Sequence, residues 1–199
     1  MYRVVHPNRQ RAFTLVEIMI AIAVMSILAA IGIQAFRASQ VKHQFMGEIE
    51  ECIGAIQDTA NIGKSCRFLE IDNKFIKSRE GEKLAGRVKI TKPKDGHITW
   101  TIWKNGRRVR GGFIGGNYSN EVIIEADGFS ARARQGSKIQ QGAALEISGD
   151  GGSFCIIYMP DGTPLLGGEI AFNLNSSSRS IRTITAKVSS VGRVTTVTK

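Results

Sequence analysis

The chain has 199 residues, with 22 glycines, four prolines and a formal net charge of +10. This length fits one modest domain plus one long helix and excludes two full hydrophobic cores. The positive balance is compatible with nucleic acid, anionic lipid or an acidic partner, and by itself it selects none of them.

A basic leader precedes a long apolar run. Residues 1–12 are basic and polar and contain no acid, and Glu17 is the one charged residue in the run Phe13–Ile33 that follows. A helix needs about 20 apolar residues to cross the hydrocarbon core of a bilayer, and this run is about 21 residues long, or about 30 Å as a helix. Positive charge ahead of the run favours a cytoplasmic leader and places the rest of the chain outside the cytoplasm.

Two simpler interpretations compete for this segment. A secretory signal peptide would have a shorter apolar core followed by a small-x-small cleavage site, for which Ala29, Ala30 and Gly32 offer small residues. A plain single-span anchor leaves Glu17 unexplained, because a carboxylate inside an apolar span costs about 2.5–3.5 kcal/mol on insertion scales and therefore requires a partner.

The segment from Arg11 to Glu17, with the sequence RAFTLVE, resembles the type IV prepilin signal. The resemblance implies that a prepilin peptidase cleaves between Ala12 and Phe13 and that the new Phe13 amine is N-methylated. It also implies that Glu17 pairs with the N-terminal amine of a neighbouring subunit during assembly. The physics agrees, because a buried carboxylate needs a counter-charge and the cleavage creates a cation one turn away. The family usually has glycine before the cleaved bond, where this chain has Ala12.

Beyond the apolar run, apolar residues recur at spacings of three and four and define one face of a helix. These residues are Phe45, Ile49, Cys52, Ile53, Ile56 and Ala60. We expect one helix over about residues 13–62, ending near Gly63, with residues 13–33 in lipid and residues 34–63 packed on a domain. Two helices with a break near residues 37–44 are the alternative.

From about residue 86 the apolar period changes to two, which indicates strands. In residues 97–104 (HITWTIWK), Ile98, Trp100 and Ile102 lie on one face. Further strands are expected at residues 87–90, 108–114, 121–126, 143–148, 153–159, 169–174, 180–189 and 193–198. Asp-Gly and Asn-Gly pairs between these runs are typical of tight turns.

The predicted fold class is α+β. A long N-terminal helix, transmembrane in its first half, packs on an antiparallel β-rich globular domain of the pilin-like type, which covers residues 64–199. Residues 154–159 are the most continuous apolar run of this domain, and they are expected to form its central buried strand.

The carboxyl third carries a second resemblance. Residues 156–163 (IIYMPDGT) are followed by residues 170–174 (IAFNL), residues 182–188 (RTITAKV) and Gly192-Arg193-Val194. This order resembles the minor pseudopilin H of type II secretion and the related FimT-like minor pilins. In that family a Pro-Asp-Gly hairpin precedes a strand pair, and a basic strand follows.

The three cysteines, Cys52, Cys66 and Cys155, form no CxxC pair and no Cys/His cluster, so we expect no metal site. Outside the cytoplasm, Cys52 and Cys66 are a candidate disulfide pair. Buried free thiols are the alternative, and the apolar surroundings of Cys155 favour it.

No reactive constellation points to an enzyme. His6, His43 and His97 cannot meet in one catalytic group, and the chain has no HExxH motif and no phosphate-binding loop. The glycine-rich residues 111–116 are expected to form a flexible turn or a bulged strand. We therefore expect no catalytic residues and no cofactor.

Arginines gather in two places. Arg107, Arg108 and Arg110 surround an expected hairpin tip, and Arg182 and Arg193 lie near the carboxyl end. Some FimT-like relatives bind DNA through arginines near the carboxyl end, so these five side chains are candidate contacts for nucleic-acid phosphates. A solvated basic face is the alternative, and the paired arginines expected near the end are absent.

The resemblances imply a structural minor pseudopilin, assembled into a short periplasmic filament that supports protein export. They imply a single span in the bacterial inner membrane, a periplasmic carboxyl domain, and three kinds of partner: other pilin or pseudopilin subunits, a prepilin peptidase and an inner-membrane assembly platform. A minor type IV pilin that binds DNA or a surface through its basic face is the alternative, and an anchored enzyme is disfavoured.

Overall fold

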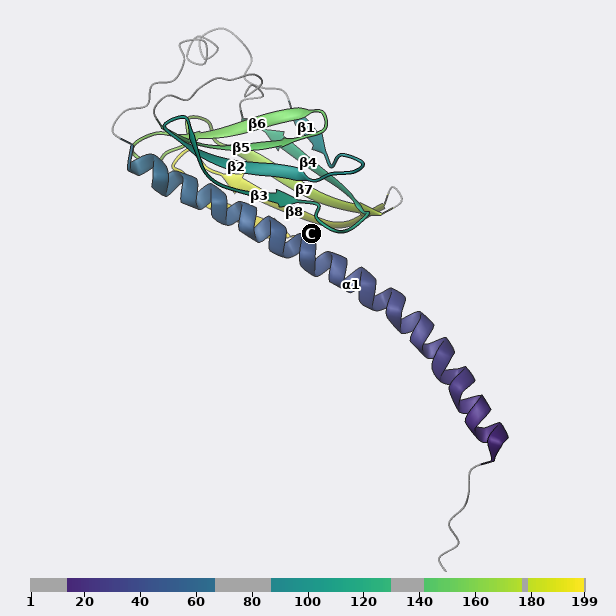
Figure 1. Ribbon diagram of the computed structural model, residues 1–199. Helices are drawn as coiled ribbons and strands as arrows, with labels where there is room; N and C mark the ends of the chain where they lie inside the picture. The colour runs from purple at the N-terminus through teal and green to yellow at the C-terminus, as the bar shows by residue number, and fades with distance from the viewer. Residues whose placement is uncertain (1–13, 67–86, 130–141, 177–178, 199) are drawn as a thin grey trace, which may run out of the picture. The chain divides into compact units, whose positions relative to one another are not determined.

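The computed structural model describes residues 14–66, 87–129, 142–176 and 179–198. The chain forms two units, residues 1–41 and residues 42–199. One helix, α1 (Leu15–Lys64), runs without interruption through residues 37–44 and contributes to both units (Figure 1). Antiparallel strands follow it, which confirms the predicted α+β class.

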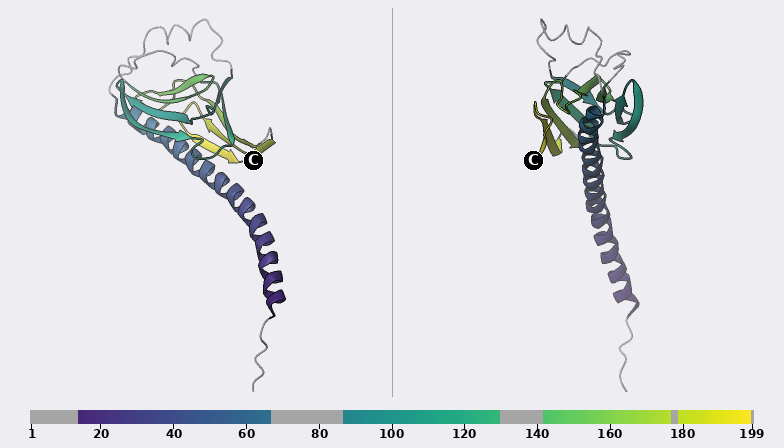
Figure 2. Two further views of the ribbon diagram at one scale, coloured as in Figure 1. Left: turned by 45° about the vertical axis from the view of Figure 1, so that its right-hand side comes forward. Right: turned by 90° about the vertical axis from the view of Figure 1, so that its left-hand side faces the viewer.

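The strands form two sheets in the described part of the chain. They are β1 (Val88–Thr91), β2 (Ile98–Lys104), β3 (Arg107–Ile114), β4 (Glu121–Asp127), β5 (Ala143–Gly149), β6 (Gly152–Tyr158), β7 (Gly168–Ser176), β8 (Arg179–Val188) and β9 (Val194–Thr198). One sheet has the order β1-β4-β7-β8-β9 and the other the order β3-β2-β5-β6. The two sheets form two layers (Figures 1 and 2). Each strand lies within two residues of its predicted ends.

Strand β2 shows why the strand predictions succeed. Ile98, Trp100 and Ile102 are fully buried, as the alternation predicts. At the end of β2, Asn105 and Gly106 have φ angles of 50° and 71°. A two-residue hairpin turn that matches the twist of its strands needs positive φ at both central positions, which Asn-Gly supplies.

The glycine-rich residues 111–116 were expected to form a flexible turn or a bulged strand, and residues 111–114 belong to β3. The one extra residue in this hairpin is Val109, next to the register shift between the two strands. Gly112 lies opposite Trp100, and a Cβ atom at Gly112 would come within 2.4 Å of Cζ2 of the indole. The glycine therefore makes room for the largest buried side chain of the core.

The prediction that residues 154–159 form the central strand is wrong. Residues 153–158 are buried, but β6 is the last strand of its sheet. Other elements supply the burial. Phe129 stacks on Phe154 with a centroid separation of 6.0 Å, and the Leu165 amide donates to the Ile157 carbonyl at 2.7 Å. A continuous apolar run indicates that both faces of a strand are covered, and it does not reveal the position of that strand in the sheet.

The second part of α1, residues 42–64, packs on the domain through the predicted face. The buried residues of α1 are Phe45, Ile49, Cys52, Ala55, Ile56, Thr59, Ala60 and Gly63. Ile53, which the pattern also placed on this face, is only half-buried. The helix ends at Lys64, one residue beyond the predicted stop, and Ser65 and Cys66 close it by donating their amides to the Ile62 and Gly63 carbonyls.

Candidate functional site

The first part of α1 is apolar on all sides. Every large apolar side chain from Leu15 to Phe36 is at least 47% exposed in the isolated chain. A helix that is apolar all round is covered in the cell by lipid or by other helices. Within the described residues, α1 is the one helix long and apolar enough to cross a membrane, and a single N-terminal helix of this kind is compatible with a membrane anchor.

Thr14 and Glu17 form a capping box at the start of this helix. Glu17 Oε2 accepts hydrogen bonds from the Thr14 amide at 2.9 Å and from Thr14 Oγ1 at 3.0 Å. In return, the Glu17 amide donates to Thr14 Oγ1 at 3.2 Å. These bonds satisfy amide groups that the first turn of a helix leaves without partners.

The capping box uses one oxygen of the Glu17 carboxylate and leaves the other available. Within the described residues, Glu17 Oε1 accepts no hydrogen bond, so this oxygen is free for a donor from another molecule. Ala12 and Phe13, the predicted cleavage and methylation residues, lie outside the described residues. Sequence reasoning missed the cap, although the Thr-x-x-Glu spacing is its signature.

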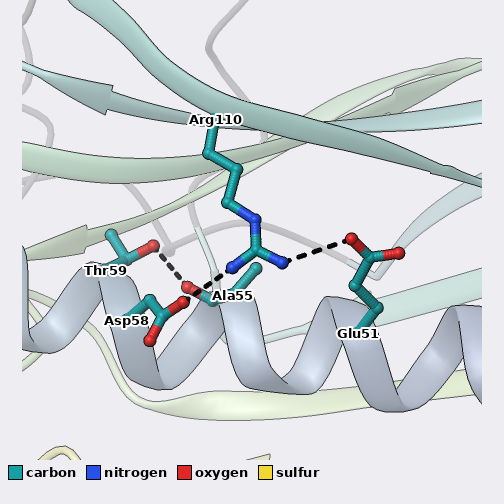
Figure 3. A network of polar contacts seen from close by, with 5 residues as sticks. All are labelled: Glu51, Ala55, Asp58, Thr59 and Arg110. Carbon is teal, nitrogen blue, oxygen red and sulfur yellow. Dashed lines mark hydrogen bonds and ion pairs between the residues drawn. The ribbon is translucent and has the colours of Figure 1, made fainter.

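Arg110 is a structural residue rather than a free cation. Its Nη1 atom lies 3.0 Å from Asp58 Oδ2 and its Nη2 atom 3.3 Å from Glu51 Oε1, both on α1 (Figure 3). The guanidinium also lies 5.6 Å from the centroid of the Trp100 ring. Exposed ion pairs of this kind contribute roughly 0.2–1 kcal/mol each. Arg110 therefore ties β3 to the helix.

The structure separates the other candidate arginines. Arg107 and Arg108 are exposed on β3, Arg193 is exposed after the β8–β9 turn, and Arg182 is half-buried on β8. Strands β3 and β8 belong to different sheets. The five arginines therefore do not line a single strand or a single sheet.

A polar cluster that sequence reasoning missed surrounds Glu48. Its carboxylate accepts hydrogen bonds from the Gly115 amide at 2.8 Å, the Gly116 amide at 3.2 Å and the Tyr118 hydroxyl at 2.8 Å. Lys92 donates to the Tyr118 carbonyl, and its Nζ atom lies 5.1 Å from the centroid of the Tyr118 ring. Glu48 is not one of the apolar residues whose spacing predicted the packed face of the helix.

The cluster has electrostatic consequences. Burial raises the pKa of Tyr118, and the hydrogen bond to Glu48 raises it further, because both favour the neutral phenol. Burial lowers the pKa of Lys92, and the charge of Glu48 opposes that shift.

The loop that Glu48 holds forms one wall of a cleft of about 530 Å³, lined by residues 92–97 and 116–121.

The candidate disulfide is not formed. Cys52, Cys66 and Cys155 are all free and buried. The helix from Cys52 to Lys64 extends about 18 Å, whereas the Cα atoms of a disulfide lie within about 7 Å. Burial raises the pKa of the Cys52 and Cys155 thiols and keeps them protonated.

Within the described residues, no group of three or more His, Cys, Asp or Glu side chains is placed to hold a metal ion.

Residues 7–33 match the family model of the prokaryotic N-terminal methylation motif. The match covers the Ala12–Phe13 junction, the Thr14–Glu17 cap and the apolar span. The motif indicates a type IV pilin-like or pseudopilin-like protein, a class that is generally structural and associates with pilin subunits and a prepilin peptidase. No curated protein and no solved structure matches the chain.

Proposed function

We propose that this chain is a minor pseudopilin of a type II secretion system, built into a short periplasmic filament that supports protein export. The observation that carries the proposal is the methylation motif over an apolar helix whose first turn contains Glu17. The carboxyl third resembles both minor pseudopilin H and the FimT-like minor pilins, so the choice between them rests on the arginines. The candidate DNA contacts lie on different sheets and Arg110 is paired with Glu51 and Asp58, which supports the secretion role over a DNA-binding pilin.

Assembly depends on a charge that cleavage creates. Prepilin peptidase cuts between Ala12 and Phe13, and the new amine keeps its positive charge after N-methylation. Glu17 then pairs through Oε1 with the amine of a neighbouring subunit, while Thr14 holds Oε2 and fixes the carboxylate. This ion pair offsets the cost of about 2.5–3.5 kcal/mol for a carboxylate in an apolar span.

The leader gives the orientation. Arg3, Arg9 and Arg11 precede the span and stay in the cytoplasm, so the β-rich domain is periplasmic and the chain crosses the inner membrane once. An assembly platform in that membrane then extracts the helix into the filament. The domain moves with residues 42–64, because the buried face of the helix, Arg110 and Glu48 bind the two together.

The test compares Glu17→Ala with Ser26→Ala in full-length chains expressed beside the other filament subunits. Ser26 is the matched control, because it is also a polar residue of the span, and among the described residues its Oγ atom bonds the Ile22 carbonyl alone, at 2.7 Å. We expect both variants to insert and to be cleaved, and only Glu17→Ala to be lost from purified filaments. Normal incorporation of Glu17→Ala would contradict the proposal.

Mass spectrometry of the purified protein tests the processing step. The proposal requires a mature chain that begins with N-methylated Phe13. A chain that still begins at Met1, or one that begins beyond Ala29 as a cleaved signal peptide would leave it, is incompatible with the proposal.

A further inference from the structure

Strand β9 leaves one side of the five-stranded sheet open. It is the last strand in the order β1-β4-β7-β8-β9, and in the part of the chain that the structure describes no strand pairs with its outer side. Residues 195–198 are exposed, with Val197 at 58%. In the right-hand view of Figure 2, β9, in yellow, lies at the margin of the domain.

The ladder shows which backbone groups of β9 point outward. The Ser189 amide donates to the Arg193 carbonyl at 2.9 Å, so Arg193 is bonded toward β8. Bonded and non-bonded positions alternate along an antiparallel pair, so Thr195 and Val197 also bond to β8. The residues whose N–H and C=O groups face away from the sheet are Val194, Thr196 and Thr198.

This edge lacks the usual protection against strand pairing. Natural edge strands carry charges, prolines or bulges that block the approach of another chain. Strand β9 has the sequence VTTVT and pairs with β8 without a register shift. All five residues are β-branched, which favours an extended backbone. An exposed edge of this kind is a template for strand addition.

The charge around the edge selects the occupant. From Arg179 to the end, the chain contains five Lys or Arg residues and no acid, and Lys187 and Arg193 are exposed beside β9. Pairing with a second copy would bring two positively charged β8–β9 hairpins together, which is unfavourable. We propose that β9 binds an extended segment of a partner protein, β-branched at its centre and flanked by acidic residues, as a sixth strand of this sheet. The inference is independent of the proposed filament role.

The test uses the full-length protein in detergent micelles and a synthetic peptide of alternating valine and threonine with glutamates at both ends. Amide hydrogen exchange is followed residue by residue. At a peptide concentration about ten times the dissociation constant, exchange at Val194, Thr196 and Thr198 should slow about tenfold. Thr195 and Val197, already bonded to β8, should change little. A peptide with lysines in place of the glutamates should give no protection.

Thr196→Pro sharpens the test, because proline there removes an outward N–H and leaves the bonds to β8 in place. We expect this variant to lose the protection given by the peptide, and the matched Thr196→Val variant to keep it. If Thr196→Pro disturbs β9 itself, seen as faster exchange at Thr195 and Val197, a peptide N-methylated at alternate amides replaces it and should fail to bind the unaltered protein.

Three results would overturn the inference. The first is no protection of the outward amides by the glutamate peptide at millimolar concentration, and the second is equal protection by the lysine peptide. The third is protection that grows with protein concentration and needs no peptide, which would assign the edge to a second copy of the chain.

Discussion

Glu48→Ala is expected to lower the stability of the domain although it leaves the hydrophobic core unchanged. It removes one carboxylate that accepts three hydrogen bonds, two at 2.8 Å and one at 3.2 Å. Two of the donors are backbone amides in the loop before β4, and the third is the Tyr118 hydroxyl, whose side chain is buried. Alanine leaves all three without their partner.

The expected cost follows from these contacts. A hydrogen bond to a charged group contributes about 1.5–3 kcal/mol, and two short bonds at the lower end of that range give about 3 kcal/mol. The longer bond to Gly116 and the better helix propensity of alanine roughly offset each other. For a chain of this size, a loss of about 3 kcal/mol corresponds to a fall in Tm of about 6–12 °C.

The assay is thermal and urea unfolding of the full-length chain in a mild detergent, followed by the fluorescence of Trp100 and Trp103 in β2. Glu50→Ala is the matched control, since Glu50 is exposed on the same helix and makes no side-chain hydrogen bond within the described residues. Its effect should stay within about 0.5 kcal/mol. Glu48→Gln should fall between the two. If Glu48→Ala were no less stable than Glu50→Ala, the reasoning would be refuted.

Three further outcomes are expected. Tyr118→Phe should cost about 1–2 kcal/mol, whereas Tyr158→Phe should cost nothing measurable, because the buried Tyr158 hydroxyl has no partner among the described residues. Stability should fall as the pH rises above about 10, the ordinary pKa of an unfolded tyrosine, since burial raises the pKa of both phenols and only the unfolded chain then releases its protons. Unfolding titrations between neutral and alkaline pH check both. If the protein binds DNA in a salt-dependent way in a gel shift, the double variant Arg107→Ala/Arg108→Ala should lose this binding. Arg110→Ala should keep it, because the Arg110 guanidinium is already paired with Glu51 and Asp58. Loss of binding in Arg110→Ala alone would show that Arg110 gives up these ion pairs to contact DNA.

The strands could be predicted from the sequence because their signals are local. In β2 the alternation of Ile98, Trp100 and Ile102 with polar or half-buried neighbours fixes both the strand and its inner face, and Asn105-Gly106 fixes the turn. The order of the strands in each sheet is not local. Residues 154–158 are equally apolar at the centre of a sheet or at a covered edge, so the sequence predicted their burial and misplaced the strand.

Arg110 illustrates the same limit for charges. On the sequence it belongs to a basic run with Arg107 and Arg108, and a basic run suggests an anionic ligand. Its partners Asp58 and Glu51 lie 52 and 59 residues earlier in the chain. The packing of β3 against α1 brings these two acids to Arg110, so a residue that the sequence suggested as a phosphate contact instead forms ion pairs within the domain.

The two glutamates with the clearest roles show when a single sequence reveals a function. Glu17 is visible because it is the one charged residue in a long apolar run, where an ionised group has a high cost. Glu48 lies in a charged stretch of the same helix, and its three donors lie 67 to 70 residues further along the chain. A charged residue in an apolar run thus stands out in the sequence because of the free-energy cost of burying it. A charged residue among other polar residues is recognised only when the structure shows its partners. Within the described residues Glu17 accepts hydrogen bonds through one of its two oxygens, and the partner that we propose for the other oxygen belongs to a neighbouring subunit. Glu48 is satisfied within the fold, and its loss should lower stability before it affects assembly.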